Sequence, residues 1–128
     1  MLNRSGITKQ TFGAPTTILL NPDLQFSLGV IVSNAKFVEE GGKKLVKAGT
    51  PMVGNLDART TAFTVVGEGD AAKVQGVLLH DVDVTNGNAN GTLLINGFVN
   101  TNRLTSATKA MVTEDVKKAI PTVKFIAG

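Results

Sequence analysis

The sequence predicts a small, mainly β domain with one short C-terminal helix (α+β), preceded by an irregular N-terminal arm. Three observations lead to this prediction. The length of 128 residues suits a single domain. With 14 Gly, 15 Thr and 10 Asn, the composition is typical of short strands joined by many turns. Short apolar runs recur between the turn residues, and a helical spacing of apolar residues appears only near the C-terminus.

The first 27 residues differ from the rest of the chain, because they show neither helical nor strand periodicity over a useful length. Their apolar run, residues 18–20, stops at an Asn-Pro-Asp turn, since proline removes a backbone donor and restricts the preceding residue. Two interpretations stay open: a first strand of the domain, or an arm that becomes ordered only on a partner. We assign residues 1–27 to an arm and residues 28–128 to one β-rich domain. Deletion of residues 1–20 is then expected to leave a folded domain.

The first half of the domain contains several predicted strands. Residues 28–32 are continuously apolar apart from glycine, which predicts a buried strand. Residues 39–44 predict a polar turn, with acids before two glycines and lysines after them. In residues 45–53 a glycine and a proline argue against one uninterrupted central strand. Residues 61–66 form a β-branched run that predicts a further strand.

A β-hairpin is the clearest pattern in the second half. Residues 76–84 begin as an apolar run and then alternate polar and apolar side chains. Residues 85–91 contain two Asn-Gly pairs, and these residues tolerate the positive φ angles that a chain reversal requires. Residues 92–99 form the returning strand. The change from a continuous to an alternating pattern predicts one end buried on both faces and the other end half exposed.

One helix is predicted before the final strand. Thr113 can cap it, two acids follow in the first turn, and two lysines occupy the last turn. Pro121 ends the helix, and residues 122–126 predict a closing strand. The apolar stripe of the helix comprises Val112, Val116, Ala119 and Ile120.

The composition excludes several classes of catalytic site. The absence of cysteine excludes thiol nucleophiles and Cys-ligated zinc, and a single histidine cannot form a multi-His metal site. The cluster to test is His80 with Asp81 and Asp83, because two carboxylates on one strand face could hold a cation or transfer protons. No activated nucleophile accompanies them, so we favour a solvated strand face. The sequence predicts a non-enzymatic protein with no cofactor and no metal.

The charge distribution does not favour nucleic-acid or membrane binding. The formal net charge is +3 with only 18% charged residues, a weaker basic excess than nucleic-acid binders usually carry. The densest basic group, Lys43, Lys44 and Lys47, lies beside two acids, which favours a solvated turn. The six phenylalanines are scattered and are predicted to lie in the core. The polar residues 1–10 do not read as a secretory signal, and no apolar run approaches the ~20 residues of a membrane span.

Three segments together resemble the head decoration (capsid-stabilising) proteins of tailed bacteriophages. They are residues 47–52 (Lys-Ala-Gly-Thr-Pro-Met), residues 76–84 (Gly-Val-Leu-Leu-His-Asp-Val-Asp-Val) and, after the Asn/Gly loop, residues 91–100 (Gly-Thr-Leu-Leu-Ile-Asn-Gly-Phe-Val-Asn). A short helix and a final β segment follow in the same order. The resemblance covers about residues 44–128.

This resemblance implies a β-clip-like domain that forms a homotrimer and binds the major capsid protein on the outer surface of the mature head. It also implies that the protein stabilises the head against genome pressure, that it is located in the virion after synthesis in the host cytoplasm, and that the arm docks on the capsid as an added strand. The arm residues expected to make this contact are Thr8, Thr11, Phe12, Thr16, Thr17, Ile18 and Leu19. Two alternatives stay open: a head-fibre base or tail-tube protein, and a small nucleic-acid or ligand-binding β domain.

Overall fold

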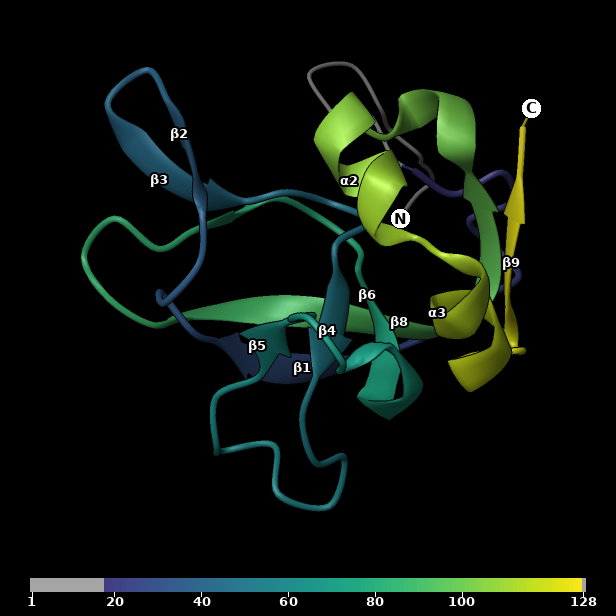
Figure 1. Cartoon of the computed structure of the whole chain (residues 1–128), viewed down its shortest axis with the longest axis horizontal. Helices are drawn as coiled ribbons and strands as arrows, with labels where there is room; N and C mark the ends of the chain where they lie inside the picture. The colour runs from purple at the N-terminus through teal and green to yellow at the C-terminus, as the bar shows by residue number, and fades with distance from the viewer. Residues whose placement is uncertain (1–17, 128) are drawn as a thin grey trace, which may run out of the picture.

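The computed structural model describes residues 18–127. The domain is mainly β, as predicted, with two short α-helices at one side (Figure 1). The strands are β1 (Phe26–Val32), β2 (Val38–Glu40), β3 (Lys43–Val46), β4 (Pro51–Val53), β5 (Thr64–Val65), β6 (Val74–Leu78), β7 (Val82–Asp83), β8 (Ala89–Asn100) and β9 (Val123–Ile126). The helices are α2 (Ser106–Met111) and α3 (Glu114–Ala119), with single 3-10 turns η1 (Ala71–Lys73) and η2 (Thr101–Arg103).

The larger sheet closes on itself. Its strand order is β1-β8-β6-β4-β5, with antiparallel neighbours throughout this path. Phe63, the residue before β5, then bridges back to Val32 at the end of β1. The Phe63 N–H donates to the Ile31 carbonyl at 2.7 Å, and the Ser33 N–H donates to the Phe63 carbonyl at 2.9 Å. These two bonds join the edges of the sheet and produce a small barrel.

Two apolar clusters form the core. One fills the barrel, where Phe63, Met52 and Leu93 are fully buried. The other lies between the C-terminal half of β8 and α3, and it includes Val116 and Ile120. Folding the chain around two adjoining clusters lets a domain of this size bury many medium-sized apolar side chains without a disulfide.

A second, smaller sheet has the order β2-β3-β7. The predicted polar turn is confirmed, because the two glycines between β2 and β3 both have positive φ angles. The predicted hairpin is only half right. β6 pairs with β8 through Val77 and Leu94, whereas β7 leaves that sheet and pairs with β3 through Val82 and Val46. The sequence changes from continuous to alternating hydrophobicity where the chain passes between the two sheets.

The prediction of a strand buried along its whole length is wrong for β1. Val30 and Val32 are buried in the barrel, whereas Gly29 is exposed and Ile31 half-buried. β1 pairs with β8 on one side, and on its other side, among residues 18–127, it is bridged only through Phe63 at its end. An outer strand of this kind needs only one apolar face.

The helix after Thr113 is confirmed, and a second helix was missed. In α3 the Thr113 hydroxyl accepts from the Val116 N–H at 3.3 Å, and Val116 and Ile120 are buried. α2 has the same kind of cap at Thr105, but Thr108 is its one buried residue. An apolar stripe is absent from α2, so periodicity could not reveal it.

Replacing Thr113 with alanine is expected to lower the free energy of unfolding by about 1 kcal/mol, because the N-cap bond to the Val116 amide is lost. Urea denaturation measures the change. Thr113→Ser keeps the hydroxyl and should stay within a few tenths of a kcal/mol of the parent protein. Equal losses in the two variants would contradict a capping role.

Residues 18–127 contain no helix that is both long and apolar enough to cross a membrane.

Candidate interaction surface

The side chains of two of the predicted docking residues belong to the core. Ile18 is 3% exposed and Leu19 is 5% exposed, and both lie in the cluster beneath α3. The side chains of these two residues are therefore part of the core, and their contact with a capsid stays a prediction. The other predicted contacts, Thr8, Thr11, Phe12, Thr16 and Thr17, lie outside the described residues.

Backbone pairing fixes residues 18–20 against β8. The Asn100 N–H donates to the Ile18 carbonyl at 2.7 Å, and the Leu20 N–H donates to the Phe98 carbonyl at 2.9 Å. Leu19 thus lies opposite Val99 in an antiparallel bridge. Residues 18–20, which we assigned to the arm, therefore pack against the β-rich domain through this short bridge.

Exposed apolar side chains gather around the C-terminal half of β8. We call this surface the apolar face and define it as Leu20, Leu24, Phe26, Phe98 and Ile126. Their exposed fractions run from 36% for Phe98 to 56% for Leu24. Large contiguous apolar surfaces are unusual on monomeric proteins and commonly mark contacts with a partner.

The strand register explains why four of these side chains, all except Leu24, share one side, and the Leu24 backbone lies beside Gly97 of β8. Leu20 lies opposite Phe98 because the bridge pairs their neighbours, Leu19 and Val99. Phe26 pairs with Asn96, two residues before Phe98 and therefore on the same face of β8. On the other flank β9 runs parallel to β8, with Lys124 beside Phe98 and Ile126 two residues further along. In Figure 1, β9 lies at the margin of the molecule.

The prediction that the phenylalanines lie in the core is wrong for the two that belong to the apolar face. Phe63 is fully buried, but Phe26 is 55% exposed and Phe98 is 36% exposed. A signal was present in the sequence: Phe98 alternates in phase with Asn96, which is exposed, and not with the buried Val99. Alternation with asparagine indicates the solvent side of a strand.

The carboxylates near His80 stabilise local structure. Asp81 accepts from the Ala48 N–H at 2.7 Å and pairs with Lys47 at 2.9 Å. Asp83 accepts from the hydroxyl and backbone N–H of Thr85, and these bonds lower the pKa of its carboxyl. In residues 18–127 there is no group of three His, Asp or Glu side chains arranged to hold a metal ion.

Lys44 of β3 and Lys47, which follows β3, are also engaged in local contacts. The Lys47 ammonium lies 2.9 Å from Asp81 and 3.2 Å from Glu40. Its hydrogen bond to Asp81 is the main reason why the pKa of Lys47 is raised, with Glu40 adding to the effect. Lys44 lies over the ring of Phe37, 4.9 Å from the ring centre. Lys47 thus has two acidic partners, and Lys44 has an aromatic one.

Comparison with known proteins yields no assignment: no protein-family model matches the chain, and no curated protein gives a significant match.

Proposed function

We propose that this chain is a structural virion protein that binds the outer surface of the mature head of a tailed phage and stabilises it against genome pressure. In this proposal the major capsid protein is the partner, the protein acts as a homotrimer, and the domain is β-clip-like. The resemblance of residues 44–128 to head decoration proteins motivates the proposal. The apolar face is the structural observation that supports it best.

In this proposal the apolar face and residues 1–17 dock on the capsid together. Residues 1–17 precede Ile18, which pairs with β8 beside Phe98. A capsid surface that covers the apolar face would therefore lie next to Ile18, the residue that residues 1–17 precede. Burying an exposed aromatic ring removes 150–250 Å² of apolar surface from water, so Phe26 and Phe98 are the expected anchors.

The carboxylates and lysines also favour a structural role over catalysis. Asp81 joins the two connections between the sheets through its bonds to Lys47 and Ala48, and Asp83 stabilises the turn after β7 through its bond to Thr85. A group that acts in general acid–base chemistry must instead be free to approach a substrate proton.

The test uses a double variant, Phe26→Ser with Phe98→Ser, mixed with purified heads that lack the protein. Each truncated anchor is expected to cost about 2 kcal/mol of binding free energy, which is a factor of about thirty in Kd. Co-sedimentation measures binding, and circular dichroism should show an unchanged melting temperature.

Phe37→Ser is the matched control, because Phe37 is 40% exposed but lies before β2, outside the apolar face. This variant should bind like the parent protein. Full affinity of the double variant would refute the assignment of the apolar face. A parent protein that does not bind heads would refute the proposed function, and filaments or rings of the purified protein would favour the tail-tube alternative.

A further inference from the structure

Asn-Gly pairs occur three times in the sequence, at residues 86–87, 90–91 and 96–97. In such a pair the backbone nitrogen of the glycine can attack the side-chain carbonyl carbon of the asparagine, because glycine has no Cβ to obstruct the approach. The new N–Cγ bond closes a succinimide ring, and the Nδ2 group leaves as ammonia with the proton of the glycine N–H. Water then opens the ring: cleavage of the new bond gives aspartate, and cleavage of the original peptide bond gives isoaspartate.

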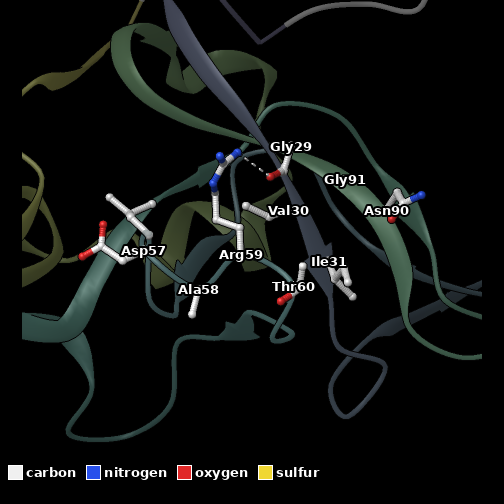
Figure 2. A pocket seen from close by; sticks show the side chains of 10 residues that line it. Gly29, Val30, Ile31, Asp57, Ala58, Arg59, Thr60, Asn90 and Gly91 are labelled. Atoms are coloured by element: carbon white, nitrogen blue, oxygen red, sulfur yellow. Dashed lines mark hydrogen bonds between the residues drawn. The ribbon is translucent and has the colours of Figure 1, made fainter.

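Strand pairing opposes this reaction at Asn90. Ring closure needs the glycine nitrogen to turn toward the asparagine side chain, whereas a paired strand keeps the backbone extended. Asn90 pairs with Ile31 and Gly91 with Val30, so both residues are held against β1 (Figure 2). An added Cβ on Gly91 would lie only 2.8 Å from Val82, which shows how closely the chain is packed at this point.

The pair at residues 96–97 is held from both sides. Asn96 pairs with Phe26 of β1, and Gly97 pairs with Val123 of β9. The Gly97 N–H donates to the Thr122 carbonyl at 3.1 Å, and Gly97 is buried. Turning the Gly97 nitrogen would therefore require β8 to separate from its neighbours.

The pair at residues 86–87 lies in a loop instead, between β7 and β8. This loop is at the left margin of the molecule in Figure 1. Asn86 is exposed, and an added Cβ on Gly87 would meet nothing within 4 Å. The Gly87 N–H donates to the Val84 carbonyl at 3.2 Å, so a turn hydrogen bond has to break before the nitrogen can turn, but no strand has to separate.

Hydrogen bonds on either side of this pair hold the ends of the loop. The Thr85 N–H donates to the Asp83 carboxylate at 2.9 Å, and the Asn34 N–H donates to the Asn88 side-chain oxygen at 3.0 Å. Because these bonds involve neither residue of the pair, residues 86–87 can rotate while the strands stay paired.

We propose that Asn86 is a site of spontaneous deamidation in the folded protein, and that β8 protects Asn90 and Asn96 from the same reaction. The product carries a new carboxylate in the loop before β8, and the formal net charge of +3 falls by one. The inference goes beyond the proposed function, because it concerns a covalent change of the chain and requires no capsid.

The experiment incubates the full chain in mildly alkaline buffer, with and without urea, because the attacking group is the deprotonated glycine amide. Peptide mapping by mass spectrometry measures the reaction at each asparagine, and isoaspartyl methyltransferase detects isoaspartate. In the folded protein Asn90 and Asn96 should react at least about tenfold more slowly than Asn86, which corresponds to about 1.4 kcal/mol of local opening free energy. In urea the three rates should converge, because the strands no longer restrain the backbone.

Isoelectric focusing of variants supplies an independent measurement. Asn86→Ser should prevent the acidic species from accumulating in the folded protein. Asn96→Ser is the matched control: it removes an Asn-Gly pair from β8, and the acidic species should accumulate as in the parent protein. Equal rates at the three sites of the folded protein would overturn the inference, as would an Asn86 that stays unmodified in the folded protein. An acidic species that persists in Asn86→Ser would overturn it as well.

Discussion

Replacing Phe63 with alanine is expected to destabilise the domain by about 3–5 kcal/mol. The ring is fully buried inside the barrel and packs against Gly54, where an added Cβ would lie only 2.5 Å from the ring. Alanine preserves the two backbone hydrogen bonds that join Phe63 to β1. The decrease in the free energy of unfolding therefore measures the cost of the cavity that the missing ring leaves. Denaturant unfolding of the full chain measures the change.

Leu24→Ala is a suitable control for this cavity, because Leu24 is 56% exposed and its truncation should change stability by less than about 0.5 kcal/mol. A loss below about 1 kcal/mol for Phe63→Ala would show that the ring does not fill the barrel. Phe63 would then be a bridging residue only.

Two N-terminal deletions are expected to differ sharply. Deletion of residues 1–17 should leave the melting temperature nearly unchanged, since Ile18 and its pairing with β8 are retained. Deletion of residues 1–20 also removes Ile18 and Leu19, whose burial contributes ~1.5–3 kcal/mol per side chain, so about 3–6 kcal/mol should be lost. This reverses the expectation from the sequence that the longer deletion leaves a folded domain.

Circular dichroism and thermal melting compare the two truncated chains directly. Equal melting temperatures would show that residues 18–20 are not part of the core. Under the proposed function, the shorter deletion also separates docking from folding: it should weaken binding to undecorated heads while the domain stays intact. Unchanged binding would assign docking to the apolar face alone.

Local signals in the sequence located most secondary structure. The cap at Thr113, the stripe through Val116 and Ile120, and the stop at Pro121 predicted α3, because all of these act within a few residues. The paired glycines before β3 predicted its turn for the same reason. α2 lacked such a signal, since it is short and its one buried residue is a threonine.

The sequence by itself determined the mainly β class, the position of α3 and the places where strands end, because propensity, capping and turn geometry depend on near neighbours. Only the tertiary structure decided that β7 joins β3, that Phe63 closes the barrel, and that Ile18 is buried while Phe98 is exposed. The apolar face follows from those decisions. Strand partners and burial depend on contacts between residues far apart in the chain, and a local pattern fits several such pairings equally well.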